Sequence, residues 1–387
     1  MKVITIIALL TAPFLLASFA AAGETEPAAS TATSDMRDKG QFFAQVGNET
    51  LSSLQFIAPA DSRFRYEGRI DYSDPAGPMI IWQGSRISID FEGETLAFRL
   101  DSLGQESFFD VHIDGSKAIL AVQKGKELNY IYQKPLAPGR HTLTLFKRSE
   151  AAAGTVLFKG IGIASGAKAW APAPISYKLA MEFFGDSITA GACNEDGDTD
   201  QWATHLTHNN ALSYAAMTAA AFSADYRNVS VSGMGVAAGF VEVLAGEMWD
   251  KLYPSAKSAS AFLKAWTPDV VLVNLGDNDY DYPNTKGKPV PPEFTDSYVS
   301  YVKAIRGAYP SAHIVLLTGG MFGGTKSVPL RKAWEAAVSR LESADPAISH
   351  FIFTHWTSNH PRVADHRAMA DELIAWLKQH AFMKSRL

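Results

Sequence analysis

The chain has 387 residues, with 35 Lys and Arg against 40 Asp and Glu, which gives a formal net charge of −5. Hydrophobic residues make up 47% and charged residues 19%, a composition that can fill a core and excludes wholesale disorder. The near balance of charge argues against a nucleic-acid partner, because such a binder usually shows a basic face. Cys193 is the only cysteine in the sequence, which excludes an intramolecular disulfide framework and a multi-cysteine metal site.

The first residues have the pattern of an export signal. Lys2 precedes an apolar run, and small residues follow that run up to Gly23. We expect a signal peptide over residues 1–22, a flexible leader over 23–39 that is rich in Ala, Ser, Thr, Glu and Pro, and a secreted or periplasmic protein. An uncleaved membrane anchor is the less favoured alternative, because the apolar run is barely ~17 residues long. No later stretch reaches membrane-spanning length, so we expect no stable membrane insertion.

Residues 40–168 have the periodicity of short strands. In the segment 86–93, Ile87, Ile89 and Phe91 alternate with polar residues, and later segments alternate similarly. Asp114-Gly115 is the predicted turn of a hairpin. These short strands predict an antiparallel β-sandwich domain over 40–168, most simply a jelly roll.

Residues 176–387 alternate strand-like and helix-like segments. The predicted strands cover residues 178–184, 228–233, 270–276, 312–320 and 350–356. The predicted helices cover residues 211–224, 292–309, 328–342 and 362–381. This alternation predicts an α/β domain with a parallel sheet covered on both faces. Ligands of such sheets bind beyond the carboxyl ends of the strands, so the chemistry is expected in the loops that follow them.

Four of these loops carry residues that could act together. Ser187 follows the first strand, Gly233 ends the second, Asn278 follows the third, and His360 precedes the last helix. A serine hydroxyl can act as nucleophile with a histidine as general base, since the unperturbed imidazole pKa of ~6.5 is near working pH. The backbone N–H groups of Ser187 and Gly233 and Nδ2 of Asn278 would supply an oxyanion hole. Each segment alone is typical of a turn or a cap, but the combination predicts a serine esterase.

These four segments resemble blocks I, II, III and V of the SGNH, or GDSL, hydrolase family, from about Lys178 to the C-terminus. The resemblance implies a flavodoxin-like three-layer α/β/α fold that acts on esters, with no metal and no organic cofactor. The segments RFRYEGRI, VHIDG and LAPGRHTLTLFKRSE resemble the jelly-roll domain of carbohydrate esterase family 2. That family removes acetyl groups from plant polysaccharides such as xylan and glucomannan. The resemblance therefore implies an acetylesterase whose partner is an acetylated oligo- or polysaccharide, with a 6-O-acetyl group among its targets.

The sequence departs from the SGNH pattern beside the histidine. Thr357 stands where the family has an Asp three residues before His360. We therefore expect a Ser–His dyad in which a backbone carbonyl near Thr357 accepts from the imidazole. Asp365 is five residues further on within a helix and should point away. A noncatalytic protein retained for carbohydrate binding and a broader lipase or thioesterase stay open as alternatives, and a monomer is the default expectation.

Several other residues have two interpretations. Trp202, Tyr280 and Trp356 could form a sugar-stacking cleft, and core packing explains each equally well. His205 and His208 would need further ligands to bind zinc, so a position on a helix surface is favoured. The acidic segment 194–200 lacks the spacing of a calcium loop and is interpreted as a solvated loop near the mouth of the active site.

Overall fold

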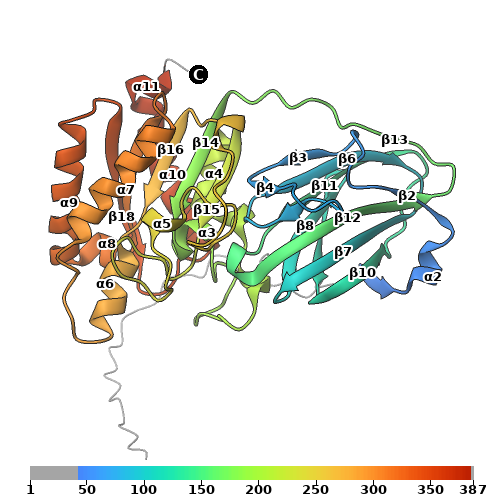
Figure 1. Cartoon of the computed structure of the whole chain (residues 1–387), viewed down its shortest axis with the longest axis horizontal. Coiled ribbons are helices and arrows are strands. Elements are labelled where there is room, and N and C mark those ends of the chain that lie inside the picture. The colour runs from blue at the N-terminus through green and yellow to red at the C-terminus, as the bar shows by residue number, and fades with distance from the viewer. Residues whose placement is uncertain (1–41, 385–387) are drawn as a thin grey trace, which may run out of the picture. The chain divides into compact units, whose positions relative to one another are not determined.

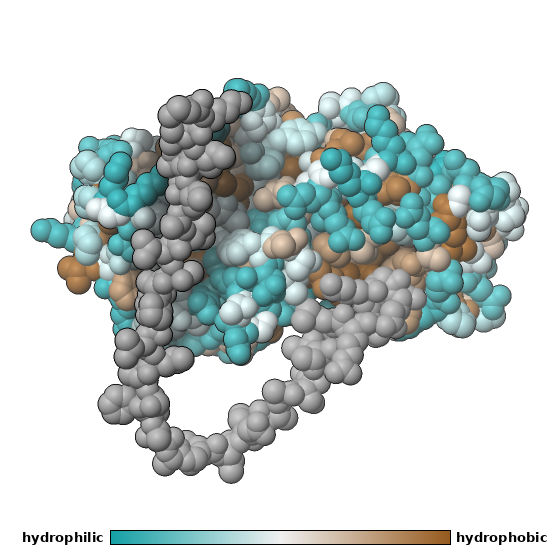
Figure 2. Space-filling model, turned by 90° about the horizontal axis from the view of Figure 1, so that it is seen from below, coloured by the Kyte–Doolittle hydropathy of each residue, from teal (hydrophilic) through white to brown (hydrophobic). Residues whose placement is uncertain are grey.

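The computed structural model describes residues 42–384. The predicted signal peptide and leader, at 1–22 and 23–39, lie outside the described residues. Within the described range, none of the helices has the length and apolar character needed to cross a membrane. On the face drawn in Figure 2, hydrophilic residues cover most of the visible surface and hydrophobic residues show between them.

Two antiparallel sheets make up the N-terminal half (Figure 1). Their strands are β1 (Phe43–Val46), β2 (Leu54–Ile57), β3 (Arg65–Glu67), β4 (Ile70–Asp71), β5 (Met79–Ile80), β6 (Arg86–Glu92), β7 (Leu96–Gly104), β8 (Ser107–Ile113), β9 (Ser116–Val122), β10 (Gly125–Tyr132), β11 (Arg140–Lys147), β12 (Gly154–Ala164) and β13 (Ala169–Trp170). One sheet has the order β1-β10-β7-β12-β5-β4, with β2 paired to β12. The other has the order β13-β6-β11-β8-β9, with β3 paired to β6. The predicted antiparallel sandwich is confirmed.

The alternation in the sequence explains how these strands form a core. Ile87, Ile89 and Phe91 on β6 are fully buried, and they belong to one cluster with apolar residues of both sheets. The predicted hairpin joins β8 to β9. Its turn residues Asp114 and Gly115 have φ values of 51° and 82°, the positive values that a two-residue type I′ turn requires. A short helix, α2 (Asn48–Leu51), and a 3₁₀ turn, η1 (Ala151–Ala153), complete this half.

The C-terminal half contains a five-stranded parallel sheet with the order β15-β14-β16-β17-β18. These strands are β14 (Leu179–Gly185), β15 (Ala224–Ser230), β16 (Val270–Asn274), β17 (His313–Met321) and β18 (Ile348–Thr357). In chain order the sheet reads 2-1-3-4-5, the flavodoxin-like arrangement, which confirms the predicted fold. Gly185 at the end of β14 pairs with Ser230 on one side and with Asn274 on the other. The ends of three strands therefore meet at one edge, at the point where the strand order reverses.

Helices cover both faces of this sheet (Figure 1). They are α3 (Ser187–Ala190), α4 (Tyr214–Ala221), α5 (Ala245–Met248), α6 (Asp277–Asn284), α7 (Phe294–Ala308), α8 (Phe322–Lys326), α9 (Val328–Glu342), α10 (Val363–Gln379) and α11 (Ala381–Lys384). The 3₁₀ turns of this half are η2 (His205–Thr207), η3 (Asn210–Leu212) and η4 (Leu263–Ala265). Apolar residues of α5, α7 and α9 pack on one face, and those of α4 and α10 pack on the other.

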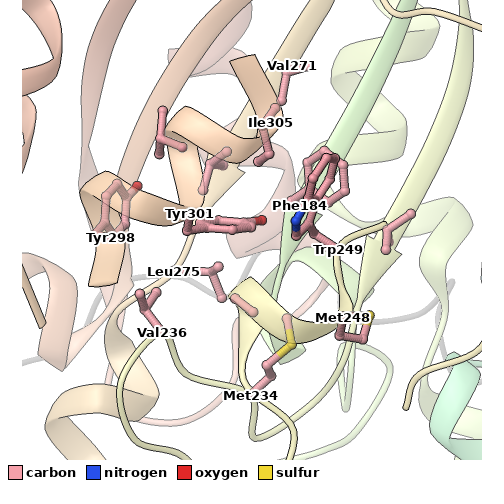
Figure 3. Close-up of a cluster of buried hydrophobic side chains, with 14 of the residues drawn as sticks. Phe184, Met234, Val236, Met248, Trp249, Val271, Leu275, Tyr298, Tyr301 and Ile305 are labelled. Atoms are coloured by element: carbon pink, nitrogen blue, oxygen red, sulfur yellow. The ribbon is translucent and has the colours of Figure 1, made fainter. Parts of the chain in front are cut away.

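Neighbouring residues of β14 show how one strand serves both layers. Phe184 belongs to the cluster with α7, where its ring lies 6.5 Å from that of Tyr301 and 6.2 Å from that of Trp249, measured between centroids (Figure 3). Phe183 belongs to the opposite cluster and contacts Tyr214 of α4. Each buried aromatic side chain of this size contributes roughly 1.5–3 kcal/mol through removal from water, so the strand is fixed from both sides.

Side chains of the sandwich also reach the parallel sheet. Arg69 donates to Glu182 of β14 at 3.0 Å, and both side chains are buried. Trp82 of the sandwich half packs in the cluster of α7 and donates through Nε1 to the Leu252 carbonyl at 2.8 Å. All the described residues, 42–384, accordingly belong to one compact unit. The division into domains at 40–168 and 176–387 stays a prediction.

Candidate active site

Ser187 lies at the edge where β14 ends. Asp186 caps the short helix α3, with its Oδ1 accepting from the Ile188 N–H at 3.1 Å, and Ser187 is the first residue of that helix. Gly185, the residue before Asp186, must lack a side chain, because a Cβ there would lie 2.1 Å from Thr189 Oγ1 and 2.5 Å from Thr189 Cβ, and 3.0 Å from the carbonyl oxygen of Asn274 on β16. This close approach of two strands brings Ser187 next to the loop that follows β16.

The structure brings His360 to Ser187 and adds a carboxylate behind it. His360 Nε2 lies 2.8 Å from Ser187 Oγ, and His360 Nδ1 lies 2.7 Å from Asp200 Oδ2. The expectation that a backbone carbonyl near Thr357 holds the imidazole is therefore wrong. The cause is that the loop after α3 returns to the histidine and places Asp200 at Nδ1. A carboxylate there fixes the proton on Nδ1 and leaves Nε2 free to accept the proton of the serine.

Asp200 is itself held in place by Arg362. Arg362 NH1 donates to Asp200 Oδ1 at 2.7 Å and to the Cys193 carbonyl at 3.0 Å, and Nε donates to the Gly197 carbonyl at 2.8 Å. Partial burial opposes the charge on Asp200, but the hydrogen bonds from His360 and Arg362 outweigh it and hold the pKa of this carboxyl well below its usual range. Asp200 is therefore a carboxylate at neutral pH.

Asp365 points away from His360, as predicted. Its Oδ1 lies 2.8 Å from His355 Nε2, and its Oδ2 accepts from the Arg362 N–H at the start of α10. The residue serves as a helix cap in a capping box and does not contact the imidazole of His360.

The predicted oxyanion-hole residues line the same cavity as Ser187 and His360. Gly233 has a φ of +79°, which glycine adopts without strain and which shapes the turn after β15. Asn278 Nδ2 donates to the Met234 carbonyl at 3.0 Å and, at 3.2 Å, to Asp186 Oδ2. The amide of Asn278 is thus fixed in orientation beside the serine loop, with the longer of its two bonds directed at Asp186.

Buried carboxyl groups support these loops. Burial, reinforced by the neighbouring Asp277, raises the pKa of Asp186 well above its usual value. Burial also raises the pKa of Asp277 to about 7 and that of Asp279 to about 6. Asp277 Oδ1 accepts from the Gly324 N–H at 2.9 Å. Asp279 accepts from three consecutive backbone N–H groups, those of Val236, Ala237 and Ala238. Asp186 and Asp279 therefore brace the loops that carry Ser187 and Gly233.

The cavity above Ser187 has a volume of about 450 Å³. It is lined by Ser187, Trp202, Ser232, Gly233, Phe240, Asp277, Asn278, Asp281, Met321 and His360. Trp202 stands edge-on to the His360 ring, with 4.7 Å between centroids, and 46% of its surface is exposed. Tyr280 and Trp356, the other two predicted stacking residues, do not line this cavity. Both instead contact the ring of Phe322, the first residue of α8, with 5.7 and 6.0 Å between centroids.

The two histidines near Trp202 are not on a helix surface. His205 begins η2 and His208 follows it, and the side chain of His208 is only 1% exposed. The expected surface position is wrong because the Glu150 carboxylate, from the sandwich, lies against both rings. Segment 194–200 was correctly placed near the mouth of the site, but its last residue, Asp200, is engaged with His360 rather than solvated.

Comparison with known families agrees with this geometry. Residues 183–381 match the model of the GDSL-like Lipase/Acylhydrolase family, a segment that includes Ser187, Gly233, Asn278 and His360. The chain belongs to this family. Residues 66–174 of this GDSL-like hydrolase match the model described as Carbohydrate esterase 2 N-terminal. Both resemblances proposed from the sequence are therefore confirmed.

Similar proteins are known for most of this GDSL-like hydrolase. A cellulase/esterase, CelE, of Acetivibrio thermocellus is 31% identical over 81% of the chain, which spans only 39% of the length of CelE. An acetylxylan esterase / glucomannan deacetylase of Cellvibrio japonicus is 25% identical over 81% of the chain and 89% of its own length. The structure of a family two carbohydrate esterase from Clostridium thermocellum in complex with cellohexaose has a TM-score of 0.73 and 29% identity, covering 84% of this chain and all of that one.

Proposed function

We propose that this GDSL-like hydrolase is a carbohydrate acetylesterase that removes O-acetyl groups from plant cell-wall polysaccharide, with xylan and glucomannan as candidate substrates. The observation that carries the proposal is the pair of hydrogen bonds on His360, 2.8 Å to Ser187 and 2.7 Å to Asp200, at the wall of one cavity. A hydroxyl, an imidazole and a carboxylate in this order form the arrangement that activates a serine for acyl transfer.

The hydrogen bonds of this arrangement determine the direction in which the proton moves during the reaction. Ser187 Oγ attacks the acetyl carbonyl carbon while His360 Nε2 takes the hydroxyl proton, and Asp200 stabilises the imidazolium that forms. The N–H groups of Ser187 and Gly233 and the side-chain amide of Asn278 donate hydrogen bonds to the negative oxygen of the tetrahedral intermediate. For Asn278 this means exchanging its 3.2 Å bond to Asp186 for one to the oxyanion.

The two halves of the reaction use the same histidine. The imidazolium of His360 protonates the departing sugar oxygen, which leaves an acetyl ester on Ser187. A water molecule then gives a proton to His360 and attacks that ester, and acetate leaves as the proton returns to Ser187. No residue is consumed, so the balance is one ester and one water to one alcohol and one acetic acid, which ionises to acetate and a proton.

The substrate class rests on the relatives and on the cavity. Relatives that match most of the chain are named acetylxylan esterase / glucomannan deacetylase, and one similar structure holds cellohexaose. The half-exposed indole of Trp202 at the cavity wall supplies an apolar face of the kind on which sugar rings stack. An apolar run after Lys2 supports export, since polymeric substrates lie outside the cell.

The proposal is tested by acetate release from acetylated xylan and acetylated glucomannan by wild type, Ser187→Ala and Ser300→Ala. Ser300 is exposed on α7 and serves as the matched control. We expect release by wild type and by Ser300→Ala, and loss of about 10⁴-fold or more in Ser187→Ala with unchanged circular dichroism. Faster release of octanoyl than acetyl groups from p-nitrophenyl esters would instead favour a lipase or thioesterase. Polysaccharide binding without any acetate release by wild type would favour the noncatalytic alternative.

A further inference from the structure

A second group of titratable side chains lies next to the active site and has no part in the proposed reaction. Glu150 precedes η1 in the sandwich half, and His205 and His208 flank η2. His208 Nδ1 lies 3.0 Å from Glu150 Oε1, His205 Nδ1 lies 3.4 Å from His208 Nδ1, and His205 Nδ1 lies 3.9 Å from Glu150 Oε1. The three side chains are 1%, 11% and 1% exposed, in that order of residue number, so water screens them little.

The partners of Nε2 in His205 and His208 bear on which nitrogen of each ring carries the proton. His205 Nε2 lies 3.1 Å from Gln105 Oε1, which can only accept, so this nitrogen carries the proton and Nδ1 carries a lone pair. His208 Nε2 faces Cys193 Sγ at 3.4 Å, and in the tautomer that donates to this sulfur, Nδ1 of His208 carries a lone pair as well. In that tautomer two nitrogen lone pairs and one carboxylate oxygen converge on the same space, as the ligands of a cation do, whereas in the other tautomer Nδ1 of His208 donates to Glu150 Oε1 at 3.0 Å.

The size of this space fits a particular cation. The three separations define a point about 2.0 Å from all three atoms, the bond length that zinc makes to imidazole nitrogen and carboxylate oxygen. Imidazole ligands favour zinc over magnesium or calcium, which prefer oxygen alone. A second-shell acceptor on each histidine, here Gln105 and Cys193, is the usual support of a zinc-bound imidazole.

We propose that Glu150, His205 and His208 bind a zinc ion through Oε1, Nδ1 and Nδ1, with water in the fourth position. The nearby Nζ of Lys147, whose pKa burial lowers to about 7, donates to the carbonyl oxygens of Ser149 and Glu150 at 3.0 and 3.1 Å, and these bonds do not use the Glu150 carboxylate.

The ion would fix the loop that carries two active-site residues. Segment 193–208 contains Asp200 and Trp202, and its far end is His208. On the other side of the ion, Glu150 Oε2 accepts from the N–H of Ser232, which lines the cavity beside Gly233. Zinc would therefore join the sandwich to two walls of the active site. Its role is structural, because the ligands do not contact Ser187 or His360.

The experiment measures metal content in the full chain, purified without a histidine tag, exposed to zinc sulfate and then desalted. We expect about one zinc per chain in wild type and almost none in His205→Gln, which alters the most exposed ligand and leaves Glu150 and His208 in place. His350→Gln is the matched control, since His350 pairs with Glu342 on the surface and should leave the zinc content unchanged. Glu150→Gln should also lose the ion.

Two further readouts keep the proposal falsifiable if a variant folds poorly. Zinc at about 100 times its Kd should raise the Tm of wild type by roughly 5 °C and leave the Tm of His205→Gln unchanged. Cobalt(II) added to wild type should give the intense visible bands of a four-coordinate site with nitrogen ligands. Wild type without bound zinc, or equal zinc in wild type and His205→Gln, would overturn the proposal and leave a protonated histidine bridging to Glu150.

Discussion

Trp202 contacts one histidine from each of two clusters, at 4.7 Å to His360 and 5.6 Å to His208 between ring centroids. Both clusters combine imidazole with a carboxylate, and both use residues from the loop after α3. They differ in their third member. The third member of the first cluster is the hydroxyl of Ser187, which donates its hydrogen, whereas the third member of the second cluster is another imidazole, that of His205.

This difference decides what each cluster can do. Along Asp200, His360 and Ser187, acceptors and donors alternate, so every hydrogen bond is satisfied and one proton can move along the line. In the site proposed at Glu150, His205 and His208, three acceptor atoms meet, and the zinc ion satisfies them. In these two proposals, similar residues serve proton transfer in one place and metal binding in another.

The largest effect should come from His360→Ala, which interrupts the line of proton transfer at its centre. We expect acetate release to fall by about 10⁴-fold or more, because the serine loses its base and the leaving group loses its acid. Zinc content should be unchanged, since His360 is not a ligand in the second cluster. Steady-state rates and metal analysis on the same preparation test both parts. A fall in zinc content would show that the two clusters are not independent.

Asp200→Asn should have the next largest effect. An amide at position 200 can donate to Nδ1, which would move the ring proton to Nε2 and remove the acceptor that Ser187 needs. A loss of about 10³-fold in kcat is expected, somewhat less than in a protease because an ester is easier to cleave than an amide. Asp198→Asn in the same loop is the control and should stay near the wild-type rate. A loss below about threefold in Asp200→Asn would support the dyad that the sequence suggested.

The sequence revealed the residues that lie at strand ends, and it did not reveal those that loops bring in. Ser187 and His360 could be predicted because a parallel sheet places the carboxyl ends of its strands at one edge. Asp200 is separated from His360 by 160 residues and lies on a long loop without periodicity, so only its acidic surroundings drew attention to it. Glu150 was harder still, since it comes from the other half of the chain.

Of the three aromatic residues predicted to bind sugar, Trp202 lines the cavity and the other two do not, for a related reason. Tyr280 and Trp356 flank the correct loops, but the path of α8 places Phe322 against both of them. Position in the sequence near the serine and histidine loops therefore identified the region of the site. Which side chains reach the cavity depends on tertiary packing, which no local sequence pattern encodes.

Asp277 lines the cavity of the first cluster, and Asp277→Asn tests how its carboxyl group changes the stability of the protein with pH. Burial, with the charge of Asp281 adding to it, raises the pKa of Asp277 to about 7 in the folded chain. A raised pKa means that the folded state binds the proton of Asp277 more tightly than the unfolded state does. The stability that this proton contributes is fully present below about pH 4 and is lost as pH rises to about 7. Asparagine mimics the protonated form and keeps the acceptor for Gly324. The variant should therefore gain stability relative to wild type over this range.

The gain should be at most about 4 kcal/mol between pH 4 and pH 8, measured as the difference in the free energy of unfolding from urea titrations. Asp296→Asn, at an exposed ion pair with Arg340, should show almost no such change. A variant that tracks wild type at every pH would mean that Asp277 is ionised in the folded chain.

The smallest effect should come from Trp202→Leu, which removes the ring that touches both clusters. In the proposed reaction the indole contacts the sugar and the edge of His360 but exchanges no proton, so its loss should raise KM for acetylated oligosaccharide about 5-fold and change kcat little. Hydrolysis of p-nitrophenyl acetate, which has no sugar, should change less than hydrolysis of the oligosaccharide. Zinc content should stay at the wild-type level, because the ligands keep their own second-shell partners, Gln105 and Cys193. A fall in kcat with both substrates would instead mean that Trp202 positions the imidazole, and a loss of zinc would mean that the ring holds η2 in place.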